Sequence, residues 1–162
     1  AASSAMGART VVVEPSPERR GAASKLGAAY TVDPEEADEL LREITDGRGA
    51  DVVVEASGRP VVMANALELV SFHGRIAYIG IDVGSDAPAK LGLIQSKELR
   101  ITGSIGSPGV WPETLRFLAG SGVDLRPLVT QRFDADEALA ALDAAHHPRT
   151  TIKAHIEFDA AL

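Results

Sequence analysis

The carboxylate of Glu14 is the first side chain in the sequence whose position suggests chemistry. It follows the β-branched run Val11 to Val13, so it lies where a short strand should end. Ser16 is a good N-cap and Pro17 a good first helical residue, so a helix should begin just after the acid. An acidic side chain at the carboxyl end of such a strand can accept hydrogen bonds from the ribose hydroxyls of a dinucleotide.

A dinucleotide-binding fold also needs a glycine-rich phosphate loop, which precedes that acid by about 20 residues. Only 13 residues precede Glu14, and they contain no such loop. The first of them, "AASSAMGA", resemble the second half of a small-residue helix already under way at Ala1. We therefore expect the loop to be missing rather than replaced. Without the loop, the local alternative is that Glu14 is an ordinary acid in a turn.

Composition and charge restrict the class of protein. The chain has 162 residues, of which 45% are hydrophobic and 24% charged, as in ordinary globular domains. Its net charge of −7 argues against nucleic acid or an anionic membrane as partner. It has no cysteine, so it can form neither a disulfide nor a thiolate metal site. No apolar run is long enough to cross a bilayer, and no signal peptide is evident, so we expect a cytoplasmic protein.

The elements that must position Glu14 alternate between strand and helix. Strands are predicted at 10–13, 30–32, 51–58 ("DVVVEASG"), 74–80 ("GRIAYIG") and 98–104 ("ELRITGS"), and helices at 17–26, near 37–44 and at 60–70. The segment "DVVVEASG" has the continuous apolar run of a strand buried on both faces of a parallel sheet. This alternation predicts an α/β fold with a doubly wound parallel sheet.

The regular alternation of strands and helices ends near residues 104–107. A helix should begin at Trp111 and a strand should cover "LVTQRF". Asp134 and Glu137 have the spacing of a capping box, so a second helix should follow them. The segment "TIKAHIEF" alternates apolar and polar residues, which predicts a strand with one buried side. We accordingly divide the chain into residues 1–105 and 106–162.

An ordered series of segments resembles one known family. The series runs "GARTVVVEPSPERRGAASKLGAAYTVDP", "GRGADVVVEASGRP", "GRIAYIGI", "LRITGSIG", "VDLRPLVTQRFDADEALAALDAA" and "TIKAHIEF". In order and spacing it resembles the zinc-type medium-chain dehydrogenase/reductase family, the alcohol, polyol and threonine dehydrogenases, over essentially all of the chain. The stretch "VWPETLRFLAGSGVDLRPLV" is most similar to the polyol and threonine branch.

The resemblance implies a fold and a function. Residues 1–105 would be a partial NAD-binding Rossmann-like domain without its first strand and glycine loop. Residues 106–162 would be an α+β segment that completes the catalytic domain. The whole enzyme would transfer a hydride between a secondary alcohol, or polyol, and NAD, and would be a homo-oligomer. Its zinc would be held by Cys and His or Glu of an N-terminal domain that this sequence lacks, so the chain alone should hold no catalytic or metal-binding residue and should be inactive.

The resemblance also implies which residues would contact NAD. Two of them lie near the adenosine ribose, three border the adenosine half, five line the nicotinamide and one reaches the pyrophosphate. In that order they are Glu14 and Arg19; Ala56, Ser57 and Arg59; Ile79, Gly80, Ile81, Ser104 and Ile105; and Lys153. These positions agree with the rule that ligands bind outside the carboxyl ends of parallel strands.

Other candidate residues favour structural interpretations. Adjacent His146 and His147 near Asp143 cannot easily share one helix face, so we expect them to be exposed rather than to bind zinc. His73 should be structural and Trp111 a packing anchor. The segment "GSIGSPG" lacks the spacing of a phosphate loop and is better interpreted as a chain crossover. Ser57 lacks the G-x-S-x-G frame of a nucleophile elbow.

Two other functions remain open at this point. The chain could be a non-enzymatic nucleotide-binding or assembly module with the same fold. It could also be another doubly wound enzyme, such as a methyltransferase, which uses a strand-end acid on a ribose as well. The pairing of "DVVVEASG" with "GRIAYIG" and the C-terminal "TIKAHIEF" strand favour the dehydrogenase.

Overall fold

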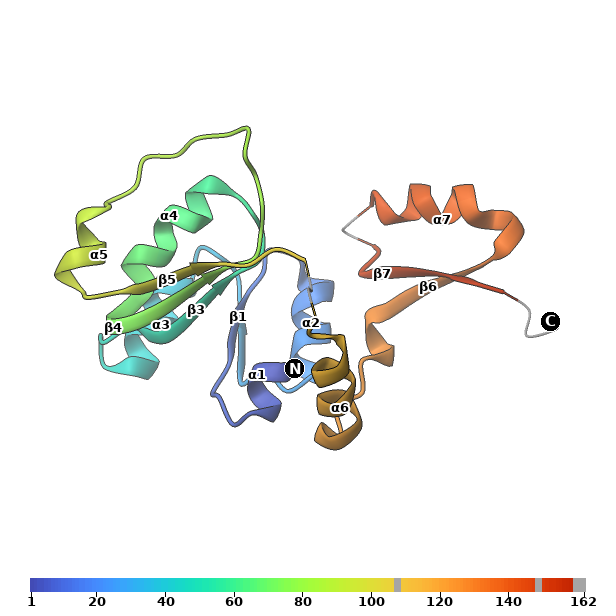
Figure 1. Ribbon diagram of the computed structural model, residues 1–162, viewed down its shortest axis with the longest axis horizontal. Coiled ribbons are helices and arrows are strands. Elements are labelled where there is room, and N and C mark those ends of the chain that lie inside the picture. Colours follow the sequence, from blue (N-terminus) through green and yellow to red (C-terminus); the bar gives the residue numbers. More distant parts are fainter. Residues whose placement is uncertain (107–108, 148–149, 159–162) are drawn as a thin grey trace. The chain divides into compact units, whose positions relative to one another are not determined.

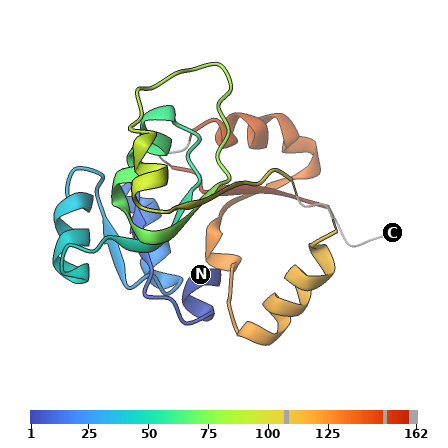
Figure 2. The ribbon, with the colours of Figure 1, turned by 60° about the vertical axis from the view of Figure 1, so that its left-hand side comes forward.

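The computed structural model describes residues 1–106, 109–147 and 150–158. These fall into two compact units, one formed by residues 1–34 with 110–162 and the other by residues 35–109. In the described part of the chain every pair of neighbouring strands is parallel, and helices connect the strands (Figure 1 and Figure 2). The α/β fold with parallel strands that the sequence predicts is confirmed.

The first unit opens with two short strands and the helix between them. Its elements are α1 (Ala2–Ala5), β1 (Val11–Val13), α2 (Pro17–Lys25) and β2 (Tyr30–Val32). Strand β1 pairs in parallel with β2, so that Val13 lies opposite Val32. The Ser16 hydroxyl oxygen accepts the N–H of Arg19 at 3.3 Å, and Pro17 is the first helical residue. The helix start predicted from the local sequence is therefore confirmed.

The C-terminal part of this unit is a second pair of parallel strands. Its elements are α6 (Trp111–Ser121), η1 (Arg126–Leu128), β6 (Val129–Asp134), η2 (Ala135–Glu137), α7 (Ala138–Ala145) and β7 (Lys153–Glu157). The predicted capping box forms, because the N–H of Asp134 donates to a carboxylate oxygen of Glu137 at 3.2 Å, but it opens the turn η2 rather than α7. The expected buried side of β7 is only partly covered: Ala154 is half-buried, whereas Phe158 lies beyond the strand and is exposed.

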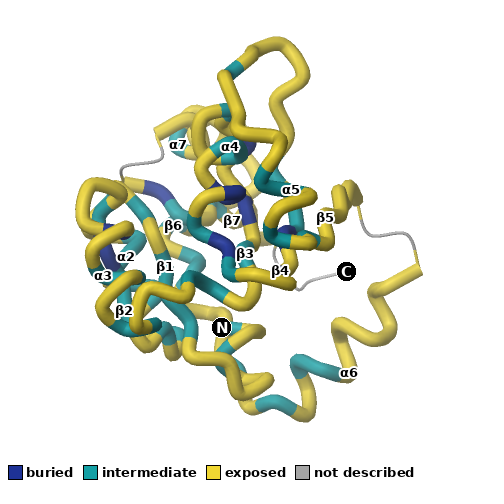
Figure 3. The backbone as a smooth tube through the Cα atoms, turned by 90° about the vertical axis from the view of Figure 1, so that its left-hand side faces the viewer, coloured by how far each residue is buried: buried dark blue, intermediate teal, exposed yellow. Residues whose placement is uncertain are grey.

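The second unit contains a three-stranded sheet with the order β3-β4-β5. Its elements are α3 (Ala37–Thr45), β3 (Ala50–Glu55), α4 (Pro60–Leu69), β4 (Val70–Tyr78), α5 (Gly92–Ser96) and β5 (Arg100–Gly103). Ala66 and Leu67 of α4 pack with Val70 and Ile76 of β4 to form its buried core. In Figure 3, which colours the backbone by burial, most of the tube is intermediate or exposed and the buried stretches are short. The short helix α5 is not among the elements that the sequence pattern predicts. It contributes Leu93, which packs against this core.

The strand β3 differs from expectation, because it is not buried on both faces. Val53 packs against the core that α4 and β4 form. Val52 and Val54 belong to the opposite face of the strand, and they are 44% and 55% exposed. The topology explains the difference. Within the described residues β3 is an edge strand with β4 as its single neighbour, and β1–β2 forms a separate sheet. The strands that the sequence predicts in one sheet thus form two separate sheets, β1-β2 and β3-β4-β5.

No helix within the described ranges has both the length and the apolar character that a membrane span requires.

Candidate functional site

The loop after β3 is built around a buried carboxylate. Glu55 ends the strand and is only 3% exposed. Its side chain accepts the backbone N–H of Ser57 at 2.7 Å and that of Gly58 at 3.2 Å, and the Ser57 hydroxyl also donates to it. The Ser57 hydroxyl oxygen accepts the N–H of Arg59 at 3.2 Å. These bonds fix residues 56–59, which carry three of the predicted cofactor contacts, ahead of α4.

The loop after β4 is fixed against the same residue. The backbone N–H groups of Ile79 and Gly80 donate to the Glu55 carbonyl oxygen at 2.9 and 3.1 Å. A Cβ atom on Gly80 would lie 2.0 Å from the backbone nitrogen of Gly58, and one on Gly58 would lie 2.6 Å from that of Ile81. Only glycine permits this backbone-to-backbone approach, and Gly58 also has a positive φ of 72°. The loops after β3 and β4 therefore pack against each other and form one edge of the sheet, at the carboxyl ends of its strands.

The chain after β5 returns to this edge. The N–H of Ser104 donates to the carbonyl oxygen of Tyr78, the last residue of β4, at 2.9 Å. The side chains of Ile79, Ile81 and Ile105 are all exposed. The structure thus brings eight of the predicted positions to the carboxyl end of one parallel sheet, where ligands of this fold class bind. Residues 107 and 108 of the predicted crossover lie outside the described residues.

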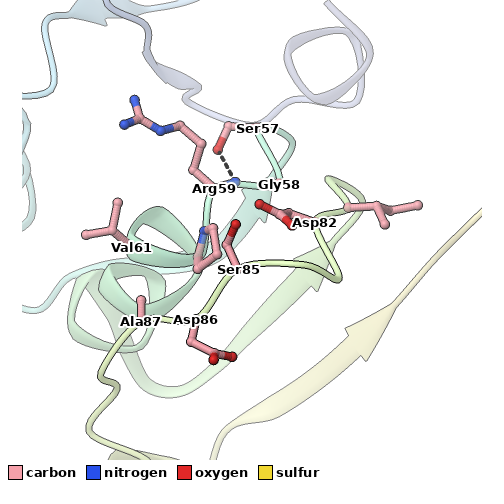
Figure 4. Close-up of a pocket in the computed structure, with 10 residues that line it drawn as sticks. Ser57, Gly58, Arg59, Val61, Asp82, Ser85, Asp86 and Ala87 are labelled. Atoms are coloured by element: carbon pink, nitrogen blue, oxygen red, sulfur yellow. Dashed lines mark hydrogen bonds between the residues drawn. The ribbon is translucent and has the colours of Figure 1, made fainter.

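A pocket of about 520 Å³ borders this edge (Figure 4). Ser57 and Arg59 line it from the loop after β3, and Asp82 and Asp86 line it from the segment after β4. The backbone N–H of Gly84 donates to the Asp82 carboxylate at 2.8 Å, and this bond is the main reason that the pKa of Asp82 is lowered. The pocket wall therefore carries one guanidinium and two carboxylates.

Sequence reasoning missed Glu55 and both aspartates of this pocket. A signal for Glu55 is present, because an acid that closes an apolar strand directly before a Ser-Gly turn can accept the N–H groups of that turn. The aspartates belong to the turn "DVGSD", whose approach to α4 no local pattern indicates.

The first unit places Glu14 at the carboxyl end of β1. Its N–H donates to the carbonyl oxygen of Val32 at 3.1 Å, and its carboxylate accepts the N–H of Ser16 at 2.9 Å. The guanidinium of Arg20 donates to the Glu14 carbonyl oxygen at 2.5 Å and pairs with Asp33 at 3.1 Å. Arg20 therefore joins the ends of the two neighbouring strands, and its charge faces a carboxylate of this chain.

Arg19 contacts the segment that precedes Lys153, 132 residues further along the sequence. The guanidinium of Arg19 donates to the carbonyl oxygen of Thr151 at 3.3 Å. Thr151 is buried, and its hydroxyl oxygen accepts from the Gln131 amide at 2.8 Å. Lys153 begins β7 two residues later, with its side chain exposed. The structure places Glu14, Arg19 and Lys153 in the first unit, and their roles as cofactor contacts stay predictions.

The described residues do not fit a catalytic zinc. Among them no group of three His, Cys, Asp or Glu side chains is close enough to hold a metal ion, and the sequence has no cysteine. His146 and His147 are both exposed, as expected, and His147 lies 3.5 Å from Asp143. His73 lies in β4, has a positive φ of 55° and faces Glu98 at 3.2 Å.

Comparisons with known proteins agree with the geometry. The family described as zinc-binding dehydrogenase matches residues 1–120. The sorbitol dehydrogenase of Bacillus subtilis (strain 168) is 32% identical over 148 residues, which are 90% of this chain and 42% of that protein. The crystal structure of an alcohol dehydrogenase from Thermotoga maritima superimposes with a TM-score of 0.86 at 26% identity, over 96% of this chain and 45% of that one.

A third relative carries a nucleotide. The crystal structure of a zinc-binding dehydrogenase from Sinorhizobium meliloti 1021 bound to NADP superimposes with a TM-score of 0.74 at 25% identity, over 84% of this chain and 42% of that one. The chain thus spans less than half the length of these relatives, and none of the three supports the methyltransferase alternative. By its matched residues, this chain belongs to the zinc-binding dehydrogenase family.

Proposed function

We propose that this chain forms the nicotinamide-cofactor-binding part of a zinc-type alcohol or polyol dehydrogenase, which transfers a hydride between a secondary alcohol and NAD. In this proposal residues 1–105 bind the cofactor and residues 106–162 complete the catalytic domain. The observation that carries the proposal is the edge formed by the loops after β3 and β4. There Glu55 fixes both loops, and Ile79 and Ile81 are left exposed beside them.

The nicotinamide ring would lie against the apolar side of this edge. The exposed side chains of Ile79, Ile81 and Ile105 offer an apolar surface that would orient the ring and exclude water from one of its faces. Gly80 and Ser104 would lie beside the ring. Because these residues carry no carboxylate, imidazole or ammonium group that could act as a general acid or base, this part of the chain would position the hydride acceptor and leave the activation of the alcohol to other residues.

Six of the predicted positions would bind the adenosine half and the pyrophosphate of the cofactor. Glu14 would accept hydrogen bonds from the ribose hydroxyls, with Arg19 nearby. A carboxylate has about four acceptor positions, so the bond from Ser16 leaves capacity for two hydroxyls. Ala56, Ser57 and Arg59 would border the adenosine, and Lys153 would supply a positive charge to the pyrophosphate.

The preference for NAD over NADP follows from local charge. A 2′-phosphate would meet the negative charge of Glu14. Arg19 and Arg20 are the cations that could compensate it. Arg20 already pairs with Asp33 at 3.1 Å, and the guanidinium of Arg19 donates to the carbonyl oxygen of Thr151 at 3.3 Å. The relative from Sinorhizobium meliloti is bound to NADP, so membership of the family does not by itself favour NAD, and the residues of this chain must decide the choice.

The zinc ion that the family name implies has no fitting ligand set among the described residues. We therefore propose that other residues of the whole enzyme hold it.

Steady-state kinetics of the whole enzyme with a panel of alcohols and polyols test the proposal. We expect oxidation that depends on a nicotinamide cofactor, with a higher kcat/KM for NAD than for NADP. A higher kcat/KM with NADP would contradict the assigned role of Glu14. NAD binding without turnover of any alcohol would favour the alternative of a non-enzymatic nucleotide-binding module.

A further inference from the structure

Glu55 is a buried carboxylate to which the proposed reaction assigns no role. Within the described residues, Glu55 and Thr151 are the buried polar side chains. Burial of a carboxylate is costly unless its oxygens accept hydrogen bonds. Both oxygens of Glu55 do so, since Oε1 accepts from Ser57 and Gly58 and Oε2 also accepts from Gly58. Among the described residues, the donors to these oxygens belong to the loop after β3.

The backbone of the same residue holds the second loop. The Glu55 carbonyl oxygen accepts the N–H groups of Ile79 and Gly80 at 2.9 and 3.1 Å. One residue therefore contacts both loops, through its side chain on one and its main chain on the other. The close approach of Gly58 to Gly80 and Ile81 transmits any displacement of the first loop to the second, because the backbones are already in contact.

We propose that Glu55 is a positioning residue for the nicotinamide cofactor, which sets the spacing of the loop 56–59 relative to the loop 79–81. The inference rests on the proposed function of these loops. Glu55 does not itself need to touch the cofactor, because its carboxylate is enclosed by the turn that it organises.

The negative charge, and not only the shape, of the side chain is needed for this role. The three groups that approach the carboxylate, two N–H groups of the backbone and one hydroxyl, all act as donors to it. An amide at this position would direct two N–H groups of its own toward them. Tyr78 lies opposite Glu55 on the neighbouring strand β4. The pKa of its phenol is raised mainly by burial and also by the negative charge of Glu55.

The test compares Glu55→Gln with Glu55→Asp in the whole enzyme, with Glu68→Gln as the matched control. Glu68 lies in the same unit and pairs with Lys90 at 2.7 Å at the surface, so its amide variant removes a charge without touching either loop. The readouts are the Kd for NADH from nicotinamide fluorescence, the KM for NAD and for the alcohol, kcat, and the thermal midpoint.

For Glu55→Gln we expect the Kd for NADH and the KM for NAD to rise about tenfold, which corresponds to one lost charged hydrogen bond. The KM for the alcohol and kcat at saturating NAD should stay unchanged. Glu55→Asp retains the carboxylate and should restore part of the affinity, which keeps the proposal testable if the glutamine variant does not fold. Glu68→Gln should behave as wild type.

The outcomes separate the inference from the proposed function. If the Glu55 variants lower the thermal midpoint but bind NADH as the wild type does, Glu55 is only structural and the inference is wrong. If Glu55→Asp binds no better than Glu55→Gln, the charge has no positioning role. If the wild-type enzyme binds neither NADH nor NADPH, the proposed function itself fails, and the inference fails with it.

Discussion

The carboxyl end of β1 is the place where a single residue would choose the cofactor. Glu14 presents a carboxylate to the proposed ribose site, while the nearby cation Arg20 is held by Asp33 and by the Glu14 carbonyl oxygen. We predict that Glu14→Gln lowers kcat/KM with NAD about 10- to 100-fold, because hydrogen bonds to a charged acceptor are lost. The ratio of kcat/KM for NAD to that for NADP should fall as well. Kinetics of the whole enzyme with both cofactors measure both effects.

Glu18→Gln is the control for this prediction. Glu18 lies four residues away, accepts a hydrogen bond from the Ser16 hydroxyl at 2.9 Å and is exposed. Its removal changes the net charge by the same amount but should leave the ratio unaltered. An equal loss of discrimination in both variants would mean that the general field of the protein, and not Glu14, selects the cofactor.

For individual residues, the sequence predicts side chains that contact their neighbours along the chain. It does not predict side chains or backbone groups that contact a distant segment. Glu14 follows β1 directly and Ser16 caps the next helix, so a window of a few residues indicates both. Glu55 acts partly through Ile79 and Gly80, which lie more than 20 residues further along the chain and therefore outside any local window around Glu55. The contact of Arg19 with Thr151 joins segments 132 residues apart and is equally invisible in the sequence.

Among the elements, α4 depends on a lysine from another segment. The ammonium group of Lys97 donates to the carbonyl oxygens of Leu67, Glu68 and Val70 at 3.0, 2.9 and 2.7 Å. These carbonyls belong to the end of the helix, where intrahelical partners are lacking and the helix dipole favours a positive charge. The partial burial that these contacts require lowers the pKa of Lys97, and the charge of Glu68 opposes the effect.

We predict that Lys97→Met lowers the free energy of unfolding by about 1–3 kcal/mol, because the last carbonyls of α4 lose a charged donor. Lys90→Met is the matched control, since Lys90 pairs with Glu68 on the surface, where such a pair contributes only about 0–1 kcal/mol. Urea unfolding of the two variants at neutral pH measures the difference. If both variants lose the same free energy of unfolding, the contacts of Lys97 with the end of α4 stabilise the protein no more than a surface ion pair does.

The elements themselves were largely predictable, but their burial was not. The strands at 11–13 and 30–32 and the helix starts at Pro17 and Pro60 follow from local residue types. The burial of β3 depends instead on which strands lie beside it. Val52 and Val54 fit a fully buried strand by composition, yet both are exposed at the edge of the three-stranded sheet.

For the molecule as a whole, we predict that residues 1–162 produced alone do not oxidise alcohols, with or without added zinc. A bound nicotinamide can accept a hydride, but the alcohol must also be activated, and the described residues offer no metal-binding group of three side chains. Incubation of the purified chain with NAD, zinc and a panel of alcohols and polyols should give no NADH absorbance above the buffer blank. Metal-dependent turnover would contradict this prediction and require a ligand set that we have not identified.

The stability of residues 1–162 as a separate molecule depends on a small buried core. Within the described residues only seven hydrophobic residues are buried, and the largest fully buried side chains are those of Ile76 and Val70. The edge strand β3 exposes Val52 and Val54, and an apolar edge with unpaired backbone groups is a template for pairing with another chain. We therefore expect a chain that is partly molten or that self-associates through this edge.

Size-exclusion chromatography with light scattering, combined with thermal unfolding, tests this expectation. Val54→Lys places a charge on the exposed side of β3 and should reduce self-association, because charged side chains disfavour edge pairing. Val83→Lys is the control, since Val83 is 97% exposed in the segment after β4 and carries no strand edge. A monodisperse wild-type monomer with a sharp transition above about 65 °C, the upper range for mesophile domains, would contradict the prediction, because such cooperativity requires a sheet whose strands all find their partners within these residues.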